Sequence, residues 1–260
     1  MLIDRCIKFR TPEDKDRFIK LSVSRIEPEI VVTQWRRVLD RATREQDVHD
    51  FLELHPELLP GLYDLHNGPL HGIVVSKFPF GADYKCDFAF LTRHSMALQF
   101  TFVEIEDPRL PIFNKDGSFS QSFNHARQQI ADWRVWVEKN IDSLMGVFSP
   151  MFETYNARDD RKDFRFYLVY GRRREVETDK KRKERWGSIE ASDDKKTKVM
   201  SYDRLNLIGP VKDRHIVCVY RDRSFCAKPE LLRQKLMVPR IRRPKRRPTR
   251  GSSRPRKLGG

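Results

Sequence analysis

Hydrophobic positions in the first third of the chain predict one clear helix. Val48, Phe51, Leu52 and Leu54 recur at helical spacing, which indicates a helix over residues 45–54. The His-Pro step that follows interrupts the pattern, because the residue before a proline is disfavoured in helical conformation. A short turn is expected there.

Three strands are expected after this helix. Residues 72–80 are β-branched and aromatic, residues 86–92 alternate between apolar and polar positions, and residues 97–107 form the best strand of the chain. Short polar stretches separate the three segments, which is typical of an antiparallel meander. Residues 109–120 are expected to form a loop.

The second half of the chain predicts a mixture of helices and strands around that meander. A long helix over 124–141 is indicated by apolar residues at steps of four and three: Ala126, Ile130, Trp133, Val137 and Ile141. The further expected elements are a short helix at 31–42, strands at 164–171, 198–205 and 214–221, and a charged helix at 172–186. This order predicts an α/β sandwich around a mixed sheet.

Charge divides the chain into a body and a tail. The net charge is +15, from 52 Lys and Arg against 37 Asp and Glu, and ten of the basic residues lie in 240–257 without any acid. From about residue 237 the chain consists mainly of Pro, Arg, Lys, Ser and Gly, which predicts disorder. We therefore expect an N-terminal extension (1–44), a folded domain (45–236) and a basic disordered tail (237–260).

Composition also excludes several classes of protein. The 17 Phe and 4 Trp are enough to build a core, and no stretch has the roughly 18 uncharged apolar residues of a membrane helix. The N-terminus has no apolar signal region. The four cysteines show no CxxC spacing, so neither a zinc site nor a disulfide framework is indicated, and a cytoplasmic location is expected.

Three acidic residues in the predicted strands are candidates for a metal site. Asp87 begins one strand, while Glu104 and Glu106 lie two residues apart on one face of the next. Acids on adjacent strands can converge on one hard cation such as Mg²⁺, which prefers carboxylate oxygens. The alternative is that both glutamates lie on a solvated face. Phe100 and Phe102 share that face and argue against it.

The order of the predicted strands and helices resembles the core of PD-(D/E)xK nucleases. In that core one strand carries an acid, the next strand carries acid-x-Lys and a helix carries Gln. More narrowly they resemble the Shedu family of bacterial anti-phage defence nucleases. The resemblance covers about residues 45–220 and rests on DVHDFLELHPELL (47–59), KCDFAF (85–90), FVEIEDPRLPIFNKDGSFS (102–120), NHARQQIADWRVWVEKN (124–140), FYLVYGRRRE (166–175) and VMSYDRL (199–205).

The resemblance implies a fold, an activity and site residues. It implies a cytoplasmic, Mg²⁺-dependent DNA endonuclease in which Mn²⁺ can substitute, and it favours a homo-oligomer. Asp87 and Glu104 would then be metal ligands. Gln129, with Trp133 four residues on, resembles a QxxxY-type helix motif that orients a metal-bound water or a DNA phosphate.

One residue departs from the family pattern. Glu106 stands where the family usually has lysine, although some restriction nucleases of this fold also carry Glu there and remain active. Glu106 could be a further metal ligand that favours a second cation, or the base that takes a proton from water. Glu45 or Asp47 could supply an additional acid, and the alternative for both is a solvated helix start.

The tail is expected to bind DNA without sequence preference. Its basic residues could neutralise phosphates and release counterions, with these six as the candidates: Arg240, Arg242, Arg243, Lys245, Arg246 and Arg247. A nuclear-localisation-like patch or a solvated tail is the alternative. Two other functions stay open for the whole chain, a catalytically inactive DNA-binding module and a nuclease-like fold that serves as a protein-interaction scaffold.

Overall fold

The computed structural model describes most of the region between residues 28 and 227 and a short strand before it. The described residues are 7–8, 28–63, 68–95, 97–152, 157–192, 194, 196–206, 215–221 and 224–227. The tail, with its six candidate DNA-binding residues, lies outside them.

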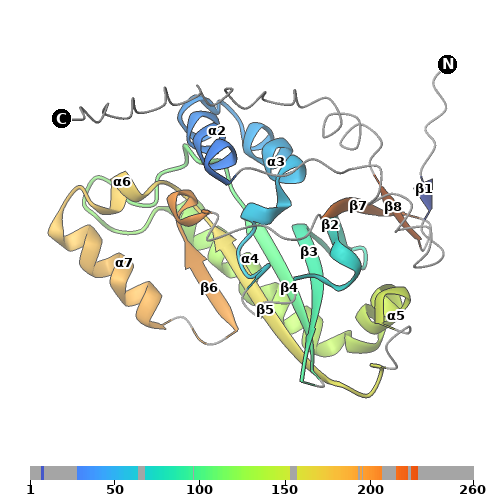
Figure 1. The fold of residues 1–260 in the computed structure, drawn as a ribbon. Helices are drawn as coiled ribbons and strands as arrows, with labels where there is room; N and C mark the ends of the chain where they lie inside the picture. Colours follow the sequence, from blue (N-terminus) through green and yellow to red (C-terminus); the bar gives the residue numbers. More distant parts are fainter. Residues whose placement is uncertain are drawn as a thin grey trace, which may run out of the picture.

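One mixed sheet forms the centre of the described part of the chain (Figure 1). Its eight strands follow the order β1-β8-β7-β2-β3-β4-β5-β6. The antiparallel meander of β2, β3 and β4 is confirmed, whereas β5 joins β4, β6 joins β5 and β7 joins β2 in parallel. The strands are β1 (Ile7–Lys8), β2 (Ile73–Phe80), β3 (Tyr84–His94), β4 (Ala97–Ile105), β5 (Arg161–Val169), β6 (Thr197–Met200), β7 (Ile216–Arg221) and β8 (Ser224–Ala227).

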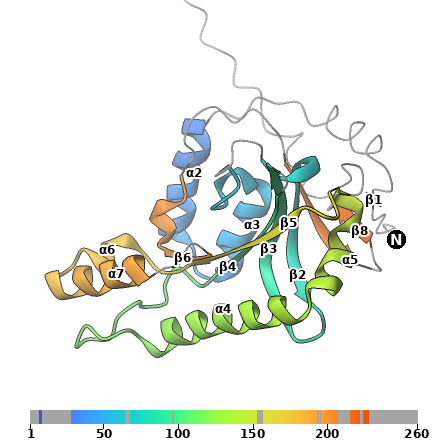
Figure 2. The same ribbon diagram turned by 90° about the horizontal axis from the view of Figure 1, so that it is seen from below.

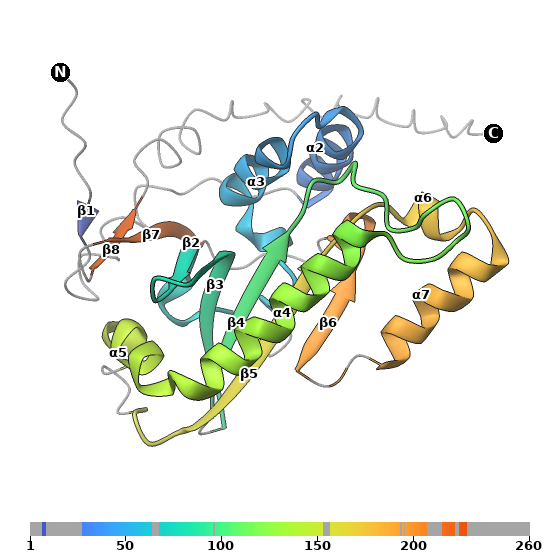
Figure 3. The same ribbon diagram turned by 180° about the vertical axis from the view of Figure 1, so that it is seen from behind.

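Helices cover both faces of this sheet, as an α/β sandwich requires (Figure 2). Helices α2 (Pro28–Arg41) and α3 (Glu45–Leu54) pack on one face, and α4 (Gln121–Lys139) and α5 (Ile141–Phe152) pack on the other. Helix α4 crosses its face of the sheet diagonally (Figure 3). The predicted mixed α/β class is therefore confirmed.

Strand β4 is fully enclosed, and all nine of its residues are buried. Phe100 and Phe102 point to the core beneath α4, while Val103 and Ile105 point to the core beneath α2 and α3. Glu104 thus follows a run of residues packed on both faces of the sheet. A carboxyl group placed there has little access to water.

Helix α4 has the buried stripe that its sequence predicts, with one exception. Ala126, Ile130, Trp133 and Val137 are buried against the sheet. Ile141 instead begins α5, because the backbone leaves the helical conformation at Asn140 (φ −124°, ψ 31°). Helix α5 was not predicted from the sequence.

Three other predicted elements have different bounds. The charged segment 172–186 is not one helix but two, α6 (Arg173–Val176) and α7 (Lys180–Ser192). The strand expected over 97–107 ends at Ile105, so Glu106 follows it. The strand expected over 198–205 is β6 followed by a 3₁₀ turn, Tyr202–Arg204.

The cysteines only partly follow the expectation. Cys86 and Cys218 are buried free thiols, but Cys226 takes part in a disulfide, which the spacing of the cysteines did not indicate. Among the described residues, no helix combines the length and apolarity that crossing a bilayer requires.

Candidate functional site

The candidate site lies where β3 and β4 stop pairing. Their backbone ladder ends at the Phe88–Val103 pair. Beyond it the backbone N–H of Asp87 donates to Glu104 Oε2 at 3.3 Å, and the N–H of Ile105 donates to Asp87 Oδ2 at 2.8 Å. Carboxylates thus replace backbone carbonyls as acceptors. The two candidate acids are fixed side by side, with 3% and 9% exposure.

Helix α4 brings the third candidate residue to the same place. The side-chain amide of Gln129 donates from Nε2 to Glu104 Oε1 at 2.7 Å. Gln129 lies one residue before the buried Ile130, at the margin of the helix face that packs on the sheet. Both oxygens of Glu104 therefore accept hydrogen bonds, one from β3 and one from α4.

Lys77 of β2 also belongs to the site, although sequence reasoning missed it. It lies opposite Asp87, between the paired positions Ser76–Phe88 and Phe78–Cys86, and its Nζ donates to Asp87 Oδ1. The same nitrogen is 3.7 Å from Glu45 Oε1. The signal available in the sequence was a single charged residue within an otherwise apolar strand.

The backbone of Lys77 is strained. Its φ of 50° lies in the left-handed region that non-glycine residues rarely occupy, at a cost of about 1–3 kcal/mol. Strain of this kind persists where the surrounding structure enforces it, and it concentrates at functional sites. Here the β2–β3 pairs before and after Lys77 hold it opposite Asp87.

Helix α3 places a second set of buried polar residues behind Asp87. The His49 ring stacks on Phe88 at 4.8 Å between centroids. His49 Nε2 is 3.7 Å from Asp87 Oδ1, and Nδ1 is 3.7 Å from Glu53 Oε1. Ser76 Oγ in turn donates to Glu53. In the sequence, the only signal for this pair was the i,i+4 spacing of His49 and Glu53.

Glu106 lies just beyond β4 and is less constrained than Glu104. Its backbone N–H donates to the Val169 carbonyl, and its carbonyl accepts from the Tyr202 hydroxyl. Within the described part of the chain, its partly buried carboxylate makes no hydrogen bond or ion pair. This carboxylate is thus available for binding or proton transfer.

The two additional acids differ from each other. Asp47 accepts hydrogen bonds from Thr43 and Arg44 and closes the start of α3, which is a structural role. Glu45 instead faces Lys77 and contributes charge to the site.

Burial and mutual repulsion make the acids hard to ionise. Burial, reinforced by the charge of Asp87, raises the pKa of Glu104 to about 10. Burial and then Glu45 raise the pKa of Glu106 to about 7. Burial lowers the pKa of Lys77, but attraction by Asp87 outweighs that effect and the net shift is upward. The cluster has more acidic than basic groups and would be stabilised by a cation.

The donor set fits a hard divalent cation. Asp87 and Glu104 offer neighbouring carboxylates, and a bound cation would favour the ionised form of Glu104 against the burial and the Asp87 charge that raise its pKa. The trio of Asp87, Glu104 and Glu106 is less tightly grouped. In the part of the chain that the structure describes, the group whose ligand atoms all lie within 4.8 Å is His49, Asp50 and Glu53.

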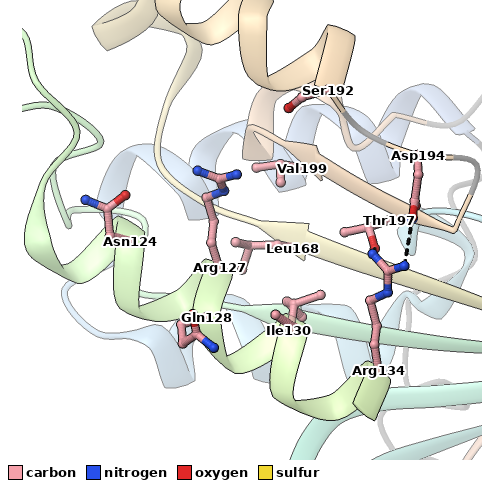
Figure 4. Close-up of a pocket in the computed structure, with 11 residues that line it drawn as sticks. Asn124, Arg127, Gln128, Ile130, Arg134, Leu168, Ser192, Asp194, Thr197 and Val199 are labelled. Atoms are coloured by element: carbon pink, nitrogen blue, oxygen red, sulfur yellow. Dashed lines mark hydrogen bonds and ion pairs between the residues drawn. The ribbon is translucent and has the colours of Figure 1, made fainter. Parts of the chain in front are cut away.

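A separate cavity of about 450 Å³ lies between α4, β5 and β6 (Figure 4). Arg127 and Arg134 line it, and Arg134 is paired with Asp194 at 2.8 Å. Its floor includes Leu168, the β5 neighbour of Glu104 in register. The candidate acids do not line this cavity, so it is distinct from the site at the strand ends.

A comparison with known protein families matches the region of the chain that contains the candidate site. The sequence model of a family described as "Shedu protein SduA, C-terminal" matches residues 42–206, which include α3, the meander, α4 and β5. A search of curated proteins found no match. The family match covers more than half of the chain and contains every residue of the Asp87 and Glu104 cluster, and on this evidence the chain belongs to the Shedu family.

Proposed function

We propose that this chain is a metal-dependent DNA endonuclease with a PD-(D/E)xK core that acts in anti-phage defence. The observation that carries the proposal is the hydrogen-bonded set of Asp87, Glu104 and Gln129 at the separation of β3 and β4. The resemblance to PD-(D/E)xK nucleases implies this arrangement, with an acid on each of two adjacent strands and a glutamine on the following helix. Defence rests on family membership alone.

The chain's residues have distinct parts in the proposed reaction. Asp87 and Glu104 would hold Mg²⁺, with Mn²⁺ as a substitute. When bound, such an ion lowers the pKa of water and offsets charge on the phosphodiester. Gln129 keeps the Glu104 carboxylate oriented through its 2.7 Å hydrogen bond. Glu106, with a pKa of about 7, accepts the proton of the attacking water.

Nicking of supercoiled plasmid across a Mg²⁺ and Mn²⁺ titration tests the proposal. Asp87→Asn and Glu104→Gln each remove one ligand charge and keep shape, so cleavage collapses while DNA binding persists or strengthens. Asp163→Asn is the matched control, because Asp163 lies at the opposite end of β5 and pairs with Arg161. If Asp87→Asn and Glu104→Gln cut as well as the parent, the site is misplaced.

A catalytically inactive DNA-binding module is the second candidate. Two observations favour it: Lys77 already neutralises Asp87, and Glu106 stands in place of the usual lysine. It predicts salt-sensitive DNA binding without nicking at any metal concentration. If the parent protein neither cuts nor binds DNA, the remaining candidate function is that of a protein-interaction scaffold. The DNA-binding role of the tail and a homo-oligomeric state remain proposals.

A further inference from the structure

The acids at the strand ends create a difficulty for any phosphodiester. Glu45, Asp87, Glu104, Glu106 and Asp107 act on one another electrostatically, and those that are ionised repel a substrate of the same sign. Besides a bound metal ion, a positively charged side chain that faces the phosphate would offset this repulsion.

Lys77 has the position for that task. Its Nζ contacts Asp87 Oδ1 and lies 3.7 Å from Glu45, so it stands between a buried acid and one at the mouth of the site. Its side chain is 37% exposed, against 4% for Asp87, so the ammonium group can meet solvent or substrate. Arg109, which pairs with Asp107 of this acidic group, is held by that residue through several hydrogen bonds.

The geometry of β2 supports a functional rather than a structural origin for this contact. Lys77 adopts a φ of 50° in the middle of a strand whose pairs on both sides are regular. A lysine that merely filled a solvated position would need no such conformation. The strained backbone conformation accompanies a specific contact, in which the Lys77 ammonium group is held against Asp87.

We propose that Lys77 is a catalytic residue that supplies, from β2, the positive charge for the scissile phosphate. This rests on the proposed nuclease function. In the reaction a bond forms between water oxygen and phosphorus, and the bond from phosphorus to the leaving sugar oxygen breaks. Glu106 takes the water's proton, and the leaving oxygen takes one from solvent. The Lys77 ammonium stabilises the charge that grows on the phosphoryl oxygens.

Three variants separate this role from a structural one. Lys77→Met removes the charge and keeps most of the chain length, Lys77→Gln is a second neutral variant, and Lys77→Arg keeps the charge. Lys162→Met is the control, since Lys162 lies at the far end of β5, where it donates to a backbone carbonyl. Each protein is compared by single-turnover plasmid cleavage with Mg²⁺ and by calorimetric titration with Ca²⁺ in the absence of DNA.

The expected result is opposite movement of the two readouts. Lys77→Met and Lys77→Gln cut about 100-fold more slowly, because a donor aimed at the transition state is removed. They bind Ca²⁺ several-fold more tightly, because a competing positive charge has left the acids. Lys77→Arg retains intermediate cleavage, and Lys162→Met matches the parent in both readouts.

The failures are distinguishable. If the parent cuts and both neutral variants cut within about threefold of it, the inference is overturned and the proposed function stands. If cleavage and Ca²⁺ affinity fall together in both neutral variants, Lys77 is a structural residue and the inference is again overturned. A parent that is inert with every metal overturns the proposed function and this inference together.

Discussion

At the scale of single residues, Glu106 is the proposed base of the site. Its carboxylate is partly buried without a hydrogen bond among the described residues, and burial followed by Glu45 raises its pKa to about 7. A base with that pKa is balanced between accepting a proton and releasing it near neutral pH. In the proposed reaction, the departure from the usual family lysine therefore supplies a base.

Glu106→Gln is expected to slow cleavage by about 100-fold, because it keeps the shape and removes the base. The parent's rate should rise through pH 7, whereas the variant should show no such rise. Glu106→Lys is expected to be inactive as well. It removes the proposed base, and the positive charge that it adds is one that Lys77 already supplies. Single-turnover rates between pH 5.5 and 8.5 provide the measurement. Equal rates and equal pH profiles for parent and Glu106→Gln would exclude Glu106 as the base.

Glu104 links protonation to stability. Its pKa is raised by burial to about 10 in the folded protein, so between about pH 5 and 9 the folded state holds a proton that the unfolded state has released. Stability then falls as pH rises through this window, with a limiting slope of about 1.4 kcal/mol per pH unit for this carboxyl.

Urea unfolding with EDTA at pH 6, 7 and 8 measures that slope. The parent should lose stability at each step, Glu104→Gln should lose less, and added Mg²⁺ should restore the parent at pH 8. Asp163→Asn should follow the parent. An identical slope in parent and Glu104→Gln would show that Glu104 is ionised in the folded protein.

At the scale of elements, the loop between β4 and α4 is held against α6 and α7 (Figure 3). The Glu175 carboxylate accepts the backbone N–H groups of Ile112 and Phe113, both buried. Gly171 has a φ of 65°, and a Cβ there would lie 2.5 Å from Ile112. The loop follows Glu106 directly, so its anchoring restricts where Glu106 can lie.

Glu175→Ala should release this loop, because two buried N–H groups lose their acceptor at a cost of about 1–3 kcal/mol. Hydrogen exchange at Ile112 and Phe113 should accelerate at least about tenfold. The control is Glu184→Ala, since Glu184 is exposed on α7 and has only a 3.7 Å ion pair with Lys180. Unchanged exchange at both amides would show that other contacts hold the loop.

The elements also explain which site residues the sequence could reveal. Alternation along one strand put Glu104 and Glu106 on one face, and the helical stripe put Gln129 at its margin, because both patterns are local. Lys77 and His49 could not be found in this way. Their contacts with Asp87 depend on the β2–β3 register and on how α3 packs on the sheet, which are tertiary features.

At the scale of the whole molecule, we propose complementary tasks for the strongly basic tail and the acidic site. In this proposal the ionised acids of the site repel phosphates, and the ten basic residues of 240–257 attract them. The tail residues lie outside the described part of the chain, so their proposed role in attracting DNA is inferred from the sequence alone.

Deleting residues 238–260 should leave the fold intact and weaken DNA binding. The slope of log K against log salt should become shallower by about 0.9 for each phosphate that the tail neutralises in the intact chain. The measurement is DNA affinity between 50 and 300 mM salt, roughly the range in which counterion release dominates. A slope that does not change would show that the tail does not touch DNA.

The central claim is that Asp87 and Glu104 hold the metal at which DNA is cut. Anomalous scattering from crystals of the Glu106→Gln variant grown with Mn²⁺ and a short duplex tests this directly, because it locates the ion without reference to activity. The predicted result is a Mn²⁺ peak in contact with both carboxylates and with a DNA phosphate. A peak only at His49, Asp50 and Glu53, the other described group of ligand atoms, would contradict the claim, as would the absence of any ordered Mn²⁺.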